Sequence, residues 1–362
     1  MGTAGHPPTI PTVKALTLHA PRDIRCETVP DPRLERPTDA IVRVELGAVC
    51  GSDLHVYHGR EAGLDPGTVM GHEFLGEVVE VGPEVRGLRP GAPVVSPFTT
   101  SCGSCFYCAR GLTCRCPAGE LFGWVADGAG LQGAQAEYVR VPLADSTLVA
   151  VPPDVSREAA LFAGDVLSTG FFCAESAGFG EGAVVAVLGC GPVGFMAVLA
   201  ARELGAGRVV AVDSVPERLR LVEALGARGV DRSREDPLEA LREETDGRGA
   251  DAVLEVVGSP EATRLAFELV RPGGTISAAG VHTEAHLAFS PVEAYDKNLT
   301  YRAGRCPARS YMDRGLELAR AGRYDLEAIV SHRLTLDEGR RAYEIFDQKL
   351  EGCTKVLLVS GS

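Results

Sequence analysis

The feature that most constrains the fold is the stretch Val184–Gly194, VVAVLGCGPVG. Five apolar residues ending at Leu188 are typical of a buried parallel strand, and the glycine-rich run that follows has the spacing G-x-G-x-x-G. The next residues, 195–201, are helix formers without a breaker. The glycines therefore lie where a strand passes into a helix, which is the context that a dinucleotide-binding turn requires.

Each glycine of this turn has a physical role. Gly189 permits the tight turn, Gly191 lets the backbone approach a pyrophosphate, and Gly194 lets the helix pack closely on the strand. Pro192 and Val193 begin the helix, whose N-terminus attracts phosphate groups. The pattern predicts a Rossmann unit, with an ordinary βαβ unit carrying a glycine-rich turn as the alternative.

The choice of coenzyme is predicted from Asp213, which ends a second apolar strand, residues 208–212. An acidic residue at about this spacing accepts hydrogen bonds from the adenosine ribose of NAD and repels the 2′-phosphate of NADP. No arginine is adjacent to Asp213, and the nearest cation is Arg218 at the start of the next helix. NAD is therefore the expected coenzyme.

Length and composition exclude several classes of protein. A chain of 362 residues with 45% hydrophobic and 23% charged residues predicts two globular domains. Its net charge of −13 argues against a nucleic-acid partner. No apolar run is long enough to cross a membrane, and the N-terminus lacks the charged start and apolar core of a secretory signal, so a cytoplasmic protein is expected. In such a chain eleven cysteines indicate metal binding more than disulfides.

The chain divides into three stretches by pattern. Residues 1–157, with a loose tail over 1–12, contain short apolar or alternating runs between glycines and prolines, as in a partly closed antiparallel fold. Residues 158–299 alternate strands and helices, beginning with a helix expected over Arg157–Cys173. Residues 300–362 are expected to rejoin the first domain. The fold class is therefore α/β, a β-rich domain interrupted by a doubly wound parallel sheet.

Four cysteines form a compact metal-binding pattern within residues 98–118. Cys102, Cys105, Cys108 and Cys116 have the spacing C-x2-C-x2-C-x7-C. Four thiolates satisfy tetrahedral Zn²⁺ and leave no open position, which makes such a site structural. An iron–sulfur cluster is the alternative, and Cys114 competes with Cys116 for the last position.

Several motifs together make the chain resemble the zinc-dependent medium-chain alcohol dehydrogenase family along essentially its whole length. They are Cys50-Gly51-Ser52-Asp53-Leu54-His55, Gly71-His72-Glu73, the four-cysteine loop and GCGPVG with Asp213. Residues 164–170, GDVLSTG, and Arg305-Cys306-Pro307 with Tyr311-Met312-Asp313 resemble the branch that contains glutathione-independent formaldehyde dehydrogenases. The resemblance implies a GroES-like catalytic domain around a Rossmann domain, an active site between them, and Cys116 as the fourth structural ligand.

The family resemblance also implies a second, catalytic zinc. Cys50, His72 and Asp165 would be its ligands, and three protein ligands leave one position open, as a catalytic zinc needs. Many family members have cysteine where this chain has Asp165. Glu73 lies beside His72 and is a ligand in polyol dehydrogenases, so that the choice between Glu73 and Asp165 stays open. Two zinc ions per chain are expected.

The implied reaction is hydride transfer between an alcohol and NAD, or its reverse from an aldehyde or ketone. Ser52 would hydrogen-bond the substrate hydroxyl, and His55 would be the outer member of a proton relay, although a helix cap and a surface histidine are the alternatives. Further contacts follow by resemblance. Thr169 and Val281 would touch the nicotinamide, Lys355 would lie near the phosphates or be a solvated strand-end charge, and Phe98 and Trp124 would line the substrate pocket.

Other functions remain to be distinguished at this point. Formaldehyde, aldehyde or polyol dehydrogenase activity is an alternative within the family, and a non-catalytic zinc-binding module is an alternative of another class. A small-molecule substrate is expected, without nucleic acid or membrane as partner. The family assembles as dimers or tetramers, so a homo-oligomer is expected.

Overall fold

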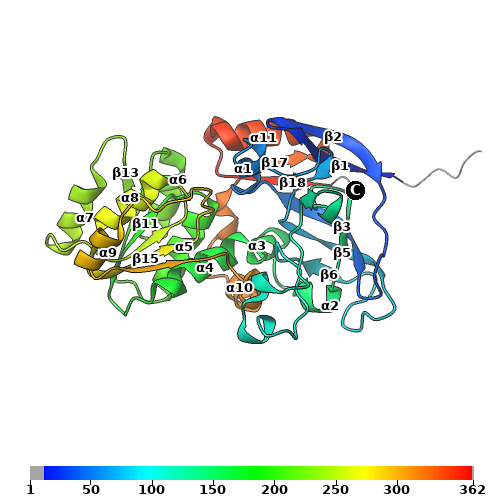
Figure 1. Cartoon of the computed structure of the whole chain (residues 1–362), viewed down its shortest axis with the longest axis horizontal. Coiled ribbons are helices and arrows are strands. Elements are labelled where there is room, and N and C mark those ends of the chain that lie inside the picture. Colours follow the sequence, from blue (N-terminus) through cyan, green and yellow to red (C-terminus); the bar gives the residue numbers. More distant parts are fainter. Residues whose placement is uncertain (1–11, 361–362) are drawn as a thin grey trace, which may run out of the picture.

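The computed structural model describes residues 12–360, which form two lobes, and the lobe on the right of Figure 1 is rich in strands. Its main sheet has the strand order β10-β6-β5-β3-β18-β17, with β9 paired to β3. The bounds are β3 Ala40–Ala48, β5 Phe74–Val81, β6 Pro93–Val95, β9 Tyr138–Val141, β10 Val149–Ala150, β17 Val330–Thr335 and β18 Lys355–Val359. Neighbouring strands of this sheet are antiparallel, except that β17 and β18 are parallel.

A smaller sheet of order β2-β1-β4 and a hairpin complete this lobe. Their strands are β1 Thr12–Ala20, β2 Asp23–Pro30, β4 Thr68–Val69, β7 Trp124–Ala126 and β8 Ala129–Leu131. The tail expected over residues 1–12 lies outside the described residues except for Thr12, which already belongs to β1 and pairs with Pro30. The short helices here are α1 Asp53–Tyr57 and α2 Ala144–Thr147.

The other lobe is built on a six-stranded sheet of order β13-β12-β11-β14-β15-β16. Every neighbouring pair is parallel. The strands are β11 Val184–Leu188, β12 Arg208–Asp213, β13 Arg228–Asp231, β14 Ala250–Glu255, β15 Val270–Ala278 and β16 Thr300–Ala303. The strand order reverses between β11 and β14, and open α/β sheets bind ligands at such a switch point. The Rossmann expectation is confirmed.

Helices cover both faces of this sheet. Alternate residues of β11 contribute to two different cores: Val185 and Val187 pack with α4 and α5, whereas Val184 and Ala186 pack with α7 and α8. All five residues of β11 are buried for that reason. The helices are α4 Val166–Ala177, α5 Pro192–Glu203, α6 Pro216–Ala224, α7 Pro237–Thr245, α8 Pro260–Leu269 and α9 Pro291–Asp296.

The single helix expected over Arg157–Cys173 is wrong, because the structure has two helices there. The first, α3, spans Arg157–Ala163, and α4 begins at Val166. Gly164 lies so close to the neighbouring strand that a Cβ there would be 2.2 Å from the Ser96 carbonyl oxygen. Asp165 has the non-helical angles φ −145° and ψ −80°. The break therefore turns the Asp165 side chain out of the helical path.

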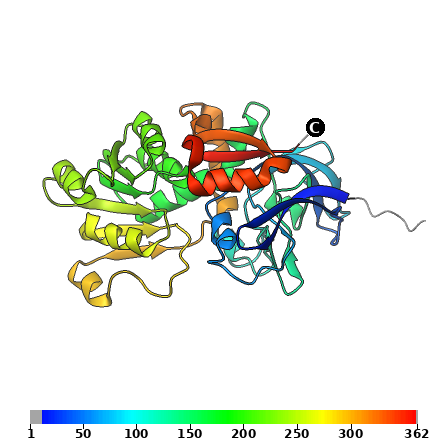
Figure 2. The same cartoon turned by 90° about the horizontal axis from the view of Figure 1, so that it is seen from above.

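The end of the chain returns to the first lobe. After α10, Met312–Ala321, the strand β18 enters the main sheet between β17 and β3, with Leu357 opposite Ala48. The last helix, α11 Gly339–Gln348, packs against β2 and β18. Figure 2 shows this red segment lying beside the blue start of the chain. Among residues 12–360, no helix is both long enough and apolar enough to cross a membrane.

Candidate active site

Four side chains from distant parts of the sequence converge in one cluster. Cys50 follows β3, His72 and Glu73 precede β5, and Asp165 lies in the break between α3 and α4. Each offers one potential ligand atom, and these atoms all lie within 4.8 Å of one another. The structure thus brings together both carboxylates between which the sequence left the choice open. A thiolate, an imidazole and carboxylates are donors that suit zinc.

Hydrogen bonds show how these groups face one another. Asp165 Oδ2 lies 3.5 Å from the Cys50 sulfur and 3.3 Å from His72 Nε2. Burial raises the pKa of the Cys50 thiol to about 11, and the charges of Asp165 and Glu73 add to the rise. Burial raises the pKa of Asp165, but the hydrogen bond and charge of His72, the charge of Lys355 and the hydrogen bond from Thr169 together outweigh burial and hold that pKa below its usual value. A cation at this point would favour the ionised form of both groups, the Cys50 thiolate and the Asp165 carboxylate.

Glu73 differs from Asp165 because it already has a cation. Lys355 Nζ lies 2.6 Å from Glu73 Oε1 and also donates to the Val49 carbonyl at 3.1 Å, and both side chains are fully buried. Glu73 Oε2 is buried without a hydrogen-bond partner. The alternative of a solvated strand-end charge for Lys355 is wrong. Lys355 also lines the cavity at the glycine-rich turn, but its ammonium group is directed to Glu73.

Sequence reasoning missed Asp53 as a functional residue. Its Oδ1 lies 3.2 Å from His72 Nδ1, and its Oδ2 accepts the backbone N–H of Cys50 at 2.9 Å. A carboxylate in this position fixes the ring so that Nε2 is free to bind a metal. The only available signal was its place three residues after Cys50, which says nothing about its contact with His72.

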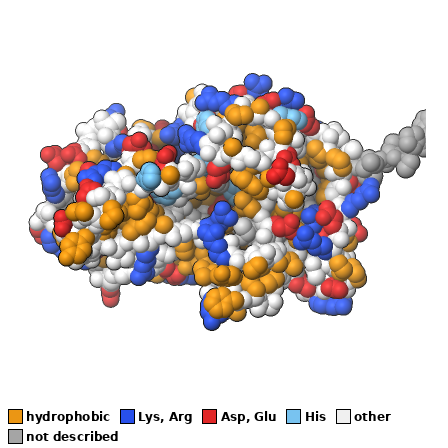
Figure 3. Space-filling view, viewed as in Figure 1, with side chains coloured by type: hydrophobic (Ala, Val, Ile, Leu, Met, Phe, Trp, Pro, Cys, Tyr) orange, Lys and Arg blue, Asp and Glu red, His pale blue; other side chains and the backbone are white. Residues whose placement is uncertain are grey.

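The second cluster consists of the four predicted cysteines Cys102, Cys105, Cys108 and Cys116, whose sulfur atoms also lie within 4.8 Å of one another. Backbone N–H groups of Ser104 and Cys105 lower the pKa of Cys102 to about 6, which favours a thiolate. The competing Cys114 is not in this cluster, since its sulfur donates to the Arg305 carbonyl at 3.3 Å. Phe106, between the second and third of these cysteines, is 62% exposed. Hydrophobic side chains gather at the lower edge of Figure 3.

The glycine-rich turn opens into a cavity of about 340 Å³ at the switch point. Its lining includes the expected contacts Gly189, Gly191, Pro192, Val193, Gly194, Asp213 and Lys355. Both oxygens of Asp213 accept backbone N–H groups: Oδ2 that of Cys190 at 2.7 Å, and Oδ1 those of Ser214 and Val215 at 2.7 and 3.0 Å.

The expectation that no cation offsets the charge of Asp213 is wrong. Helix α6 turns Arg218 back toward the strand end, and its Nη1 lies 3.9 Å from Asp213 Oδ2. Arg232 lines the same cavity. The charge next to the expected ribose position is therefore smaller than Asp213 alone would give.

A larger cavity of about 460 Å³ joins the metal-ligand cluster to the Rossmann edge. Its lining contains Cys50, His72 and Asp165 together with the remaining predicted residues Ser52, His55, Phe98, Trp124, Thr169 and Val281. Ser52 Oγ lies 3.2 Å from His72 Nε2, and Thr169 Oγ1 donates to Asp165 Oδ1 at 3.1 Å. Burial lowers the pKa of His55, whose Nδ1 is buried without a partner.

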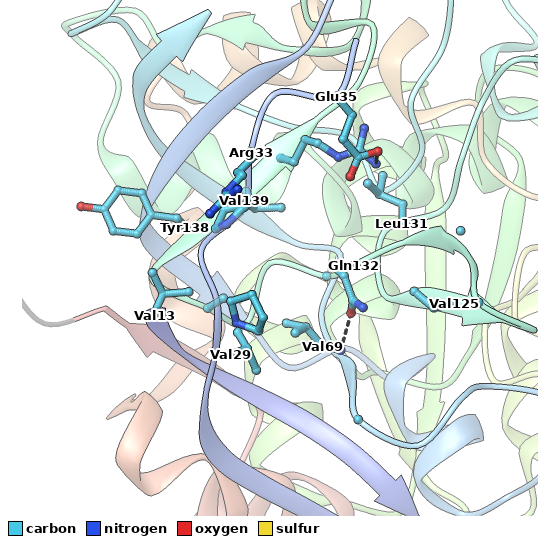
Figure 4. Close-up of a pocket in the computed structure, with 18 residues that line it drawn as sticks. Val13, Val29, Arg33, Glu35, Val69, Val125, Leu131, Gln132, Tyr138 and Val139 are labelled. Carbon is cyan, nitrogen blue, oxygen red and sulfur yellow. Dashed lines mark hydrogen bonds and ion pairs between the residues drawn. The ribbon is translucent and has the colours of Figure 1, made fainter. Parts of the chain in front are cut away.

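Another cavity, of about 360 Å³, contains none of these clustered ligands. Figure 4 shows that its walls are mostly aliphatic and that the Gln132 side chain is occupied by the Val69 N–H, at 2.7 Å. Arg33, Glu35 and Arg140 are its charged residues, and Arg140 is paired with Glu35 at 3.2 Å and with Asp39 at 3.0 Å. Chemistry is therefore better supported in the cavity between the lobes.

A β-rich lobe joined to a Rossmann lobe, with a thiol–imidazole–carboxylate cluster between them, defines a metal-dependent dehydrogenase. Family comparisons agree. Residues 36–153 match the alcohol dehydrogenase GroES-like domain, and residues 192–320 match the zinc-binding dehydrogenase domain. This chain belongs to the zinc-dependent medium-chain alcohol dehydrogenase family, and it is a zinc-dependent oxidoreductase of alcohols that uses a nicotinamide coenzyme.

Individual relatives support the same assignment. The zinc-type alcohol dehydrogenase B of Aspergillus flavus is 41% identical over 92% of this chain and 79% of its own length. The structure of the alcohol dehydrogenase TADH from Thermus sp. ATN1 has a TM-score of 0.89 and 43% identity, covering 96% of this chain and all of that one. An NADP-dependent isopropanol dehydrogenase of Thermoanaerobacter brockii is 34% identical over 89% of this chain and 93% of its own length. The more specific resemblance to formaldehyde dehydrogenases stays a prediction.

Proposed function

We propose that this protein oxidises a small alcohol with NAD⁺ in the cavity between its two lobes, or reduces the carbonyl compound in reverse. One observation carries the proposal. The same cavity is lined by the cluster Cys50, His72 and Asp165 and by Val193 and Val281 at the edge of the Rossmann sheet. A substrate held at the cluster is thereby next to a nicotinamide that enters from the switch point.

Cys50, His72 and Asp165 would hold the catalytic zinc, and Glu73 would stay outside it in the resting enzyme. The preference for Asp165 rests on charge, because Glu73 is paired with Lys355 whereas Asp165 faces Cys50 and His72. When bound, zinc polarises the substrate hydroxyl and NAD⁺ accepts the hydride.

Ser52 and His55 would move the proton. The Ser52 hydroxyl is 3.2 Å from His72 Nε2, so it faces the point where the substrate oxygen is expected. Burial lowers the pKa of His55 and so favours the neutral ring, whose unpartnered Nδ1 would accept the proton. Phe98 and Trp124 would exclude water from the reacting carbon.

A measurement of metal content separates the two candidate ligands. Asp165→Ala should lose the catalytic zinc and keep the structural one, whereas Glu73→Gln, which leaves the cluster of three intact, should keep both. Elemental analysis after dialysis gives the zinc content of each variant and of the wild type. A larger loss in Glu73→Gln would make Glu73 the resting ligand, and unchanged metal and turnover in Asp165→Ala would exclude Asp165.

NAD⁺ is the proposed coenzyme. Arg218 is expected to reduce the preference for NAD⁺ over NADP⁺. Two like charges a few ångströms apart repel by a few kcal/mol at an effective protein dielectric, but a cation 3.9 Å from Asp213 offsets part of this. We expect NAD⁺ to be preferred by about tenfold in kcat/KM, which corresponds to about 1.4 kcal/mol.

The coenzyme is tested with both nucleotides and a panel of alcohols, followed by the absorbance of the reduced coenzyme. Asp213→Ala should lower the preference for NAD⁺ over NADP⁺. Arg218→Gln should raise this preference, because no cation then offsets the charge of the Asp213 carboxylate. Equal use of NADP⁺ by the wild type would contradict the NAD⁺ proposal. A wild type that turns over no alcohol with either coenzyme would contradict the proposed reaction itself.

A further inference from the structure

Behind the proposed catalytic ligands lies a buried chain of hydrogen bonds. Asp53 touches both His72, at 3.2 Å from Nδ1, and the backbone N–H of Cys50, at 2.9 Å. The next member is Gln135, whose Nε2 donates to Asp53 Oδ2 at 3.2 Å and to the Ala48 carbonyl at 3.1 Å. The Asp53 carboxylate thus connects the proposed ligands Cys50 and His72 to Gln135, which lies shortly before β9.

The chain ends on the last helix of the protein. The hydroxyl of Tyr343, in α11, donates to Gln135 Oε1 at 2.8 Å. Gln135 is 1% exposed and Tyr343 is fully buried. Both N–H groups and the oxygen of the Gln135 amide are therefore engaged in hydrogen bonds within the protein.

Tyr343, Asp53 and the Ala48 carbonyl together decide which way this amide points. A glutamine amide can turn so that its oxygen and nitrogen exchange places, and the reversed orientation would direct the oxygen at the Asp53 carboxylate. Burial raises the pKa of Tyr343 well above its ordinary value, so the hydroxyl keeps its proton and donates it to the Gln135 oxygen, which supports this orientation of the amide.

Packing holds Gln135 in the same place. Gly71, immediately before His72, has φ +91°, and a Cβ on it would lie 2.3 Å from Gln135 Cγ. The side chain is therefore pressed against the backbone that carries His72, and it has no room to move toward it.

We propose that Gln135 and Tyr343 are positioning residues for the catalytic metal site: Tyr343 orients Gln135, Gln135 orients Asp53, and Asp53 holds His72 with Nε2 directed at the metal. The inference rests on the proposed ligand set of Cys50 and His72. It makes α11, near the end of the chain, part of the apparatus that defines metal affinity.

The test is a double-mutant cycle on metal affinity, with Tyr343→Phe, Gln135→Met and the two combined. Zinc affinity is measured by competition with a chelator, and Co²⁺ is used as a probe whose absorption reports thiolate and imidazole coordination. Partners outside the ligand shell typically change metal affinity 10- to 100-fold, and Tyr343→Phe is expected to weaken zinc binding at the catalytic site by about tenfold. With Gln135→Met already present, it should add less than about twofold, since no amide is left to orient.

A purely structural role for Tyr343 gives a different result. Its ring lies 5.3 Å from that of Tyr57, so Tyr57→Phe is a matched control that changes a neighbouring tyrosine outside the hydrogen-bonded chain. Loss of thermal stability with unchanged zinc affinity and an unchanged Co²⁺ spectrum in Tyr343→Phe would overturn the inference, as would equal effects of Tyr343→Phe in both backgrounds.

The outcomes also separate this inference from the proposed site. If the wild type binds metal only at the four-cysteine site, both fail. If it binds a second metal through Cys50 and the variants bind it equally well, only the role of Gln135 and Tyr343 fails. Should Gln135→Met not fold, the comparison of Tyr343→Phe with Tyr57→Phe decides alone.

Discussion

Lys355 and Asp165 show, at the scale of single residues, what the sequence can and cannot predict. The resemblance placed Asp165 among the ligands, and the structure brings it within 3.5 Å of the Cys50 sulfur. The partner of Lys355 was not predictable, because Glu73 is 282 positions away and the two meet only where β18 enters the main sheet. Asp53 and Gln135 were missed for the same reason, since their contacts are made by the tertiary fold.

Removing one partner of the buried Lys355–Glu73 pair should strongly lower the free energy of unfolding. Lys355→Met would leave the Glu73 carboxylate buried without its cation, which typically costs about 3–5 kcal/mol. Adding Glu73→Gln should restore much of that loss, because the buried charge is then removed. Urea unfolding of the zinc-loaded proteins measures both effects.

A surface pair is the control for this prediction. Lys14 and Asp337 form an ion pair at 2.8 Å with both side chains more than half exposed, so Lys14→Met should change the free energy of unfolding far less. Equal losses for Lys14→Met and Lys355→Met would contradict the role assigned to burial.

Short sequence motifs predicted the elements best where spacing alone determines the geometry. The strand Val184–Leu188, the start of α5 after the glycines, and the second strand over residues 208–212 agree with the structure. The break between α3 and α4 was not predicted, because its cause is the close approach of Gly164 to the Ser96 carbonyl, a contact between distant segments. Strand β2, with its mixed polar and apolar residues, was missed as well.

The glycines of the turn should separate folding from coenzyme binding. A Cβ on Gly194 would lie 1.8 Å from the Gly189 carbonyl oxygen, so Gly194→Ala should disrupt the turn and lower the melting temperature. At Gly191 the nearest atom would be the flexible Arg218 Nη1 at 3.5 Å, so Gly191→Ala should fold normally and bind coenzyme poorly. Thermal unfolding and titration with NADH distinguish the two, and normal NADH binding by Gly191→Ala would refute the expected pyrophosphate position.

The four-cysteine segment contains a control residue, Cys114, for the predicted metal site. Cys116→Ala should lose the structural metal and much of the thermal stability, because binding of such a metal contributes directly to folding. Cys114→Ala, in the same short helix-and-turn segment but outside the cluster, should keep the metal and the melting temperature. Elemental analysis decides, and detection of iron in place of zinc would favour the iron–sulfur alternative.

At the scale of the whole molecule, the path of the chain determines how each lobe is assembled. The Rossmann sheet is continuous in sequence, whereas the β-rich lobe is completed only when β18 pairs with β3. This explains why the motif of the turn predicted its lobe well and why the catalytic cluster, assembled from several segments, could be predicted only through the family resemblance. The pair Lys355–Glu73 beside the cluster likewise forms only when β18, near the end of the sequence, joins β3.

Assembly is the last property that the whole molecule allows us to predict. Within the described residues, β16 is paired on one side only, with β15, so its other edge presents unpaired backbone groups. Next to it α9 exposes 69% of Val292 and 82% of Tyr295, and hydrophobic side chains gather over α9 at the left of Figure 3. A second copy that pairs along β16 would cover both the strand edge and these side chains, so we expect a homo-oligomer built on this surface.

Substitutions in α9 test this interface directly. Val292→Lys combined with Tyr295→Lys should shift the protein toward monomers, because charged side chains would have to be buried between the copies. Sedimentation velocity at micromolar concentration measures the shift. Leu350→Lys, which changes an exposed hydrophobic residue of the β-rich lobe, should leave the assembly intact. A monomeric wild type would contradict the expected homo-oligomer. An assembly that persists in the α9 variant and dissociates in Leu350→Lys would place the contact between copies elsewhere on the molecule.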